Sequence, residues 1–134
     1  MRRVAAAAAL SILGACGQTS PTGGPSPDKY AGLDGEILNW RKEILAADPL
    51  CTSTVADQRC QSFEVACKAE RPVTPADQAK GITVRVVTMI TWNGFDPKFQ
   101  HPQSGTQAAE FTKAASHWSR VRHGPVYMQT CGDL

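Results

Sequence analysis

Apolar residues between positions 33 and 47 recur at helical spacing. Those on one side are Ile37, Leu38, Trp40, Ile44 and Leu45, and a helix with such a stripe buries one face. We predict this helix from Gly35 to Ala47, with Asp34 as its cap and a hydrophobic staple between Leu33 and Leu38. It should end at Asp48-Pro49, because the residue before a proline is pushed out of the α region.

A second helix is predicted from Thr54 to Arg71. Thr54 is a suitable N-cap with Asp57 three residues later, and Pro72 stops the helix after Arg71. One side of this helix would carry Cys60, Phe63, Ala66 and Cys67. Two helices with apolar sides need a common surface to cover.

That surface is predicted to be a sheet, and its clearest strand runs from Ile82 to Trp92. The segment is dense in β-branched residues, which favour strands. Alternation places Ile82, Val84, Val86, Ile90 and Trp92 on one face, and Arg85, Val87, Met89 and Thr91 on the other. A capped single turn at 74–77, closed by Gly81, precedes this strand, and Val126–Cys131 is a further strand candidate.

Residues 106–122 fit two structures. A helix would bury a stripe made of Ala108, Phe111, Ala115 and Trp118. The alternative is two strands, Thr106–Lys113 and His117–Arg122, because a stable sheet usually needs three or more strands. We predict the strands. The expected fold class is α+β, with two N-terminal helices packed on a small, mainly antiparallel sheet (a meander) that two disulfides staple.

The N-terminus carries a targeting signal. Arg2 and Arg3 precede an apolar run of ten residues, Val4 to Leu13, which is too short for a helical membrane span of about 20 residues. The run closes on Leu13-Gly14-Ala15-Cys16, which resembles the lipobox of bacterial lipoproteins. The resemblance implies cleavage before Cys16 and acylation of that cysteine, with palmitate as one expected lipid. The alternative is a secretory signal peptide without lipidation.

The same resemblance implies a location. Gly17, after the cysteine, is similar to the sorting signal for the outer membrane rather than to the inner-membrane aspartate signal. We therefore expect an anchor in the outer membrane, facing the periplasm. Three segments follow: a signal peptide at 1–15, a lipid-anchored flexible tether at 16–29 that is rich in Pro, Gly and Ser, and a globular domain at 30–134.

Cleavage changes the charge of the chain. Loss of Arg2 and Arg3 lowers the number of lysines and arginines from 14 to 12, against 12 acidic residues, so the formal charge of +2 becomes zero. A neutral chain has no overall field that attracts nucleic acid. We expect no nucleic-acid partner.

Four cysteines remain once Cys16 is assigned to lipid: Cys51, Cys60, Cys67 and Cys131. An even set in an oxidising compartment predicts two disulfides with three possible connectivities. Within one helix, Cys60 and Cys67 would lie about 10.5 Å apart, beyond the roughly 7 Å that a disulfide spans, so we exclude that pair. We favour Cys51–Cys60 with Cys67–Cys131. The spacing lacks Cys-x-x-Cys, so we expect no metal and no cofactor.

The segment from Asn93 to Gly105 is predicted to be a long loop and the best candidate for function. Trp92, Phe95 and Phe99 would form an aromatic patch for a partner. The alternative is that Phe95 and Phe99 turn back and plug the end of the sheet.

Two further sets of residues are candidates for chemistry. Asp96, His101 and Ser104 are the residue types of a catalytic acid–base–nucleophile set. They share one Pro-rich loop, however, and precise catalytic sites are rarely built on such a loop alone. Arg120, Arg122 and His123 would form a basic cluster for lipid head groups, lipopolysaccharide or an acidic partner, and Arg85 could join it across strands. The alternative for the cluster is a solvated sheet face.

These observations predict a small, non-enzymatic, lipid-anchored envelope protein that acts as a binding module. Its partners would be the membrane, through acylated Cys16, and an envelope protein or cell-wall component. One alternative is an inhibitor or accessory protein of an envelope hydrolase. The other is a hydrolase that uses the 93–105 loop.

Overall fold

The computed structural model describes residues 28–134. The signal peptide, Cys16 and nearly all of the predicted tether lie outside these residues. The elements, in chain order, are α1 (Leu33–Ala47), the 3-10 turns η1 (Pro49–Cys51) and η2 (Ala56–Gln58), β1 (Gln61–Arg71), α2 (Pro75–Ala79), β2 (Ile82–Asp96), β3 (His101–Ala114) and β4 (His117–His123).

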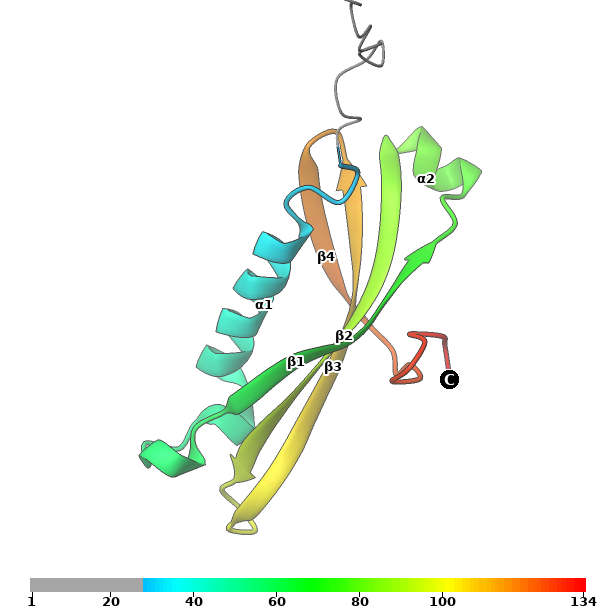
Figure 1. Cartoon of the computed structure of the whole chain (residues 1–134). Helices are drawn as coiled ribbons and strands as arrows, with labels where there is room; N and C mark the ends of the chain where they lie inside the picture. The colour runs from blue at the N-terminus through cyan, green and yellow to red at the C-terminus, as the bar shows by residue number, and fades with distance from the viewer. Residues whose placement is uncertain (1–27) are drawn as a thin grey trace, which may run out of the picture.

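The strands form one antiparallel sheet of four strands in the order β1-β2-β3-β4. Helix α1 lies along one face of this sheet, and the C-terminal segment lies against the other (Figure 1). The predicted α+β class and antiparallel meander are confirmed. The strand alternative for residues 106–122 is also confirmed, because β3 ends at Ala114 and β4 begins at His117.

Helix α1 buries the predicted side, but its first turn differs from the prediction. Its buried residues are Leu33, Ile37, Trp40 and Ile44. The ring of Trp40 packs edge-on against Phe111 of β3, with 5.9 Å between ring centroids. The helix begins two residues early, after Gly32 at φ 89°, so Asp34 is inside the helix rather than its cap. Leu38 is exposed, and the predicted staple is therefore wrong.

The predicted helix Thr54–Arg71 is wrong. It contains the short turn η2 and then the edge strand β1. The pairing of β1 with β2 shifts register between Gln61 and Glu64 and again between Val65 and Cys67. An extra residue at a bulge breaks the strict alternation of side chains between the two faces of a strand. The apolar residues of β1 are therefore spaced as they would be in a helix. The fold therefore has one long helix where two were expected.

The predicted loop from Asn93 to Gly105 is also wrong. Strands β2 and β3 continue through it, leaving only residues 97–100 as a turn. Its glycines are needed for close packing and not for turns. A Cβ on Gly105 would lie 2.2 Å from Cε2 of Trp92, and one on Gly94 would lie 2.7 Å from Cβ of Leu50.

The C-terminal strand candidate, Val126–Cys131, is replaced by an irregular segment. A single bridge joins Val126 to Asp133. The amide of Tyr127 donates to the carbonyl of Gly132, and that of Cys131 donates to the carbonyl of Tyr127, both at 2.8 Å. These local bonds occupy backbone groups that a strand would offer to a neighbour.

Two apolar clusters and two disulfides hold the domain together. One cluster lies between α1 and the sheet, and the smaller one lies beneath the C-terminal segment. The disulfides join Cys51 to Cys60 and Cys67 to Cys131, which are the pairs favoured from the sequence. The argument used to exclude Cys60–Cys67 was nevertheless wrong, because no helix contains these residues.

Candidate functional site

The turn between β2 and β3 lies at the far end of the sheet from the point where the described chain begins. At the near end, the Nζ atom of Lys113 donates to the carbonyl of Lys29 at 3.1 Å, and Lys29 forms an ion pair with Glu70 at 2.8 Å. Strand β3 has 14 residues, which at ~3.3 Å per residue gives a length of about 45 Å. The turn is therefore the outermost point of the hairpin (Figure 1).

Asp96 organises this turn. Its Oδ1 atom accepts hydrogen bonds from the amides of Lys98 at 2.7 Å and Phe99 at 3.0 Å, and its carbonyl accepts from the amide of Gln100 at 2.9 Å. Donation by the amide of Phe99, and then by that of Lys98, holds the pKa of the Asp96 carboxyl below its usual range. The carboxylate is thus committed to the backbone of its own turn.

Phe99 projects from the turn with 65 % of its surface exposed. Its ring stacks on that of His101, with 6.2 Å between centroids, and the Nζ atom of Lys98 lies 5.1 Å from the ring centre. We call residues 96–101 the hairpin tip. It presents an aromatic ring and a cation on a backbone that internal hydrogen bonds hold in place.

The other two aromatic candidates lie elsewhere. Trp92 is 2 % exposed and stacks on Phe63 of β1, with 5.7 Å between centroids. Phe95 is half-buried. The predicted three-residue aromatic patch is therefore wrong: Trp92 belongs to the core and Phe99 alone is largely exposed.

Asp96, His101 and Ser104 do not form a catalytic set. Asp96 and His101 are paired across the hairpin, but Ser104 pairs with Asn93. Because His101 and Ser104 are three residues apart on one strand, they face opposite sides of the sheet. His101 donates through Nδ1 to the carbonyl of Pro102 at 2.9 Å, and Ser104 donates to Oδ1 of Asn93 at 3.4 Å. The three side chains are bound to different partners.

The predicted basic cluster is divided between the two faces of the sheet. Arg120 faces α1, where it pairs with Glu43 and lies over the ring of Trp40. Arg122 lines a hollow on the same face beside the C-terminal half of α1. On the opposite face, Arg85 pairs with Glu110 at 2.9 Å and Asp77 at 3.3 Å. Arg120 and Arg122 therefore share one face, whereas His123, which lies beside Asp133, and Arg85 are on the other, so neither joins the two arginines.

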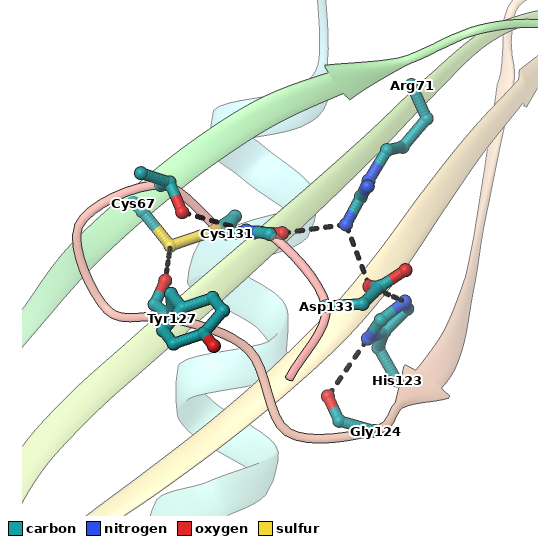
Figure 2. Close-up of a disulfide and its surroundings, with 9 residues drawn as sticks. Cys67, Arg71, His123, Gly124, Tyr127, Cys131 and Asp133 are labelled. Carbon is teal, nitrogen blue, oxygen red and sulfur yellow. Dashed lines mark hydrogen bonds and ion pairs between the residues drawn. A yellow bond between two sulfur atoms is a disulfide. The ribbon is translucent and has the colours of Figure 1, made fainter.

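The C-terminal segment is fixed to the sheet around the Cys67–Cys131 disulfide (Figure 2). Arg71 of β1 donates to the carbonyl of Cys131 at 2.7 Å and to Asp133 at 2.9 Å. His123, at the end of β4, lies 3.4 Å from Asp133 through Nε2. Two strands and a disulfide thus hold this segment in one place.

Sequence reasoning missed Tyr127 and Met128, because it assigned them to the strand candidate Val126–Cys131. Both are exposed on the C-terminal segment, at 55 % and 46 %. The signal was present in the sequence: Gly124-Pro125 and Gly132 flank the stretch, and these residue types indicate turns and irregular segments.

Within residues 28–134, no group of three or more potential metal ligands comes together. None of the helices described in that range has the length and apolar character required to cross a bilayer.

Comparison of the chain with protein-family models, with curated proteins and with solved structures finds no match.

Proposed function

We propose that this chain is a small lipid-anchored protein of the bacterial envelope whose domain binds another envelope component through the hairpin tip. The observation that carries the proposal is the exposure of Phe99 on a fixed turn at the outer end of the hairpin. Aromatic residues that protrude from a rigid backbone anchor many interfaces, because little conformational entropy is lost when they bind.

The place of the hairpin tip agrees with an anchor at Cys16. Asp28 lies twelve positions after Cys16, and a chain of twelve residue steps reaches at most roughly 40 Å. An anchor within that reach would lie at the end of the sheet where α2 and the β3–β4 turn are found (Figure 1). The hairpin tip would then face away from the bilayer, toward partners that are not in the anchoring membrane.

The charge of the hairpin tip indicates the chemistry of its partner. Lys98 is exposed, whereas the carboxylate of Asp96 accepts hydrogen bonds from backbone amides of the turn. Phe99 requires an apolar pocket, and Lys98 favours a carboxylate at its rim. The partner proposed is therefore a protein with an apolar pocket bordered by acidic residues.

Inhibition of an envelope hydrolase is the second candidate function, and the same observation favours it. A projecting hairpin that ends in one aromatic side chain can enter an enzyme cleft, and Phe99 would occupy a subsite there. An activity assay on the captured partner separates this candidate from simple binding. Loss of the partner's activity on addition of the chain would identify an inhibitor.

Site-specific crosslinking in intact cells tests the proposal. A photoreactive residue at position 100 of the hairpin tip should crosslink to a protein other than the chain itself. The control places the same photoreactive residue at position 78, where Gln78 is exposed on α2 at the opposite end of the sheet. Equal crosslinking from both positions, or none from position 100, would refute a binding site at the hairpin tip.

A further inference from the structure

The sheet face opposite α1 is only partly covered. The C-terminal segment covers Val87 and Met89 of β2 through Val126 and Cys131. Next to this covered part is a hollow of about 280 Å³, lined by Ser62, Glu64, Thr91, Trp92, Asn93, Ser104, Thr106 and Met128. Residues of β1, β2 and β3 form its floor, and Met128 of the C-terminal segment lies at its border.

The side chains of this hollow are rich in hydroxyl and amide groups. Ser62, Thr91, Ser104 and Thr106 supply hydroxyls, Asn93 an amide, and Glu64 a carboxylate. Among the described residues, the one hydrogen bond between these side chains is the long contact of 3.4 Å from Ser104 to Asn93. Most of these donors and acceptors are therefore available to a ligand.

An apolar border accompanies the polar floor. Met128 is 46 % exposed, and its neighbour Tyr127 is 55 % exposed. The Cys67–Cys131 disulfide and the 2.8 Å bond between the amide of Cys131 and the carbonyl of Tyr127 hold them in position. A ligand that fills the hollow meets hydroxyl groups below and a thioether at the side.

We infer that this hollow binds a chain of neutral, N-acetylated amino sugars. Sugar hydroxyls and the acetamide N–H can donate to Glu64, the acetamide carbonyl can accept from Thr91 or Thr106, and the acetyl methyl group can pack on Met128. A few placed polar groups beside an apolar surface are the usual composition of a small-ligand site.

The charge of the lining selects against other occupants. The described residues around the hollow include Glu64 and no cation, so phosphorylated sugars and lipid head groups would be repelled. A peptide strand could pair only at the sheet edges, along β1 or along residues 101–107 of β3, which β4 does not reach, and not on the face that forms the hollow. The inference does not depend on Phe99 or on the proposed function of the hairpin tip.

Calorimetric titration of the full chain with tetra-N-acetylchitotetraose, called chitotetraose below, tests the inference, with cellotetraose as the sugar of the same β-1,4 linkage that lacks acetamide groups. Chitotetraose should bind and cellotetraose should bind at least tenfold more weakly. Thr91→Val and Thr106→Val should each weaken binding about fivefold, the usual effect of one lost hydrogen bond. The matched control is Ser119→Ala, which removes an exposed hydroxyl of β4 outside the hollow, and it should leave affinity unchanged.

Three results would overturn the inference: no heat of binding at millimolar chitotetraose, equal binding of the two sugars, or equal loss of affinity in Thr91→Val and Ser119→Ala. Thermal unfolding of each variant shows whether its fold is intact. Met128→Ala adds a test that removes no hydrogen bond of the sheet, and it should weaken chitotetraose binding without affecting the melting temperature.

Discussion

The packing of Trp92 requires a glycine at position 105 of the paired strand. Its indole lies over Gly105 on the paired strand, and its other side stacks on Phe63. A glycine in a strand usually weakens it, but here the missing side chain makes room for a buried indole. A Ser-Gly pair often indicates a turn, but Ser104-Gly105 lies inside β3, where the glycine is needed for packing.

Gly105→Ala is expected to destabilise the domain by about 1–3 kcal/mol, the usual cost of an overpacked core. The added Cβ would lie 2.2 Å from Cε2 of Trp92, so the indole must move. Urea denaturation followed by tryptophan fluorescence measures the change. Gly35→Ala is the control, because nothing lies within 4 Å of its added Cβ and alanine favours a helix. A Gly105→Ala variant as stable as Gly35→Ala would contradict this packing.

Two aspartates are expected to make the fold sensitive to acid. Amide donors from Phe99 to Asp96 and from Thr74 to Asp77 hold the pKa of each carboxyl below its usual range. A carboxyl with a lowered folded pKa stabilises the fold above its unfolded pKa of about 3.9, and this contribution is lost as the pH falls through the folded value. Urea unfolding across acidic pH should show a decline in free energy that Asp96→Asn with Asp77→Asn makes shallower. An identical decline in the double variant would exclude these groups as its source.

At the scale of elements, the C-terminal segment is the part of the fold whose position depends most on a disulfide. It has one bridge to itself and no strand pairing, so the Cys67–Cys131 disulfide and the contacts of Arg71 hold it against the sheet. This segment covers the smaller apolar cluster and borders the hydroxyl-lined hollow. Its attachment therefore affects both stability and the proposed sugar site.

Removal of the Cys67–Cys131 disulfide is expected to cost more than removal of Cys51–Cys60. The two bonds close loops with sequence separations of 64 and 9 residues, and the chain-entropy relation gives about 4 and about 3 kcal/mol. Paired alanine substitutions, compared by urea denaturation, measure the difference. If the shorter loop proved the more stabilising, the C-terminal segment would not have the role assigned to it.

The elements differ in how far their sequences predicted them. Alternation along β2 assigned both faces correctly, since Val86 and Ile90 pack under α1 while Val87 and Met89 lie on the other side. Strand β1 could not be recognised, because its two register shifts remove the alternation that identifies a strand. In the hairpin, Gly94 and Gly105 led to the prediction of a loop, because glycine is typical of loops. Of the features predicted for that loop, only an exposed Phe99 is found in the structure.

In the molecule as a whole, the proposed lipid anchor and the proposed binding surface lie toward opposite ends of the sheet. Cys16→Ser is expected to release the protein from membranes, because it removes the side chain that would carry the acyl group. Fractionation of cells that express each form measures this directly. Unchanged partitioning of Cys16→Ser with membranes would refute the lipid anchor.

Binding at the hairpin tip is tested by truncating two exposed apolar side chains in turn and measuring the affinity of each variant for the protein crosslinked from position 100. Phe99, in the hairpin tip, is 65 % exposed, and Val121, on β4, is 61 % exposed. Phe99→Ala is predicted to raise the Kd by about 5–30-fold, as expected for an anchor worth roughly 1–2 kcal/mol, with an unchanged melting temperature. Val121→Ala should leave the Kd within about twofold. Equal affinity of the two variants, or a large thermal loss in Phe99→Ala, would contradict a binding site at the hairpin tip.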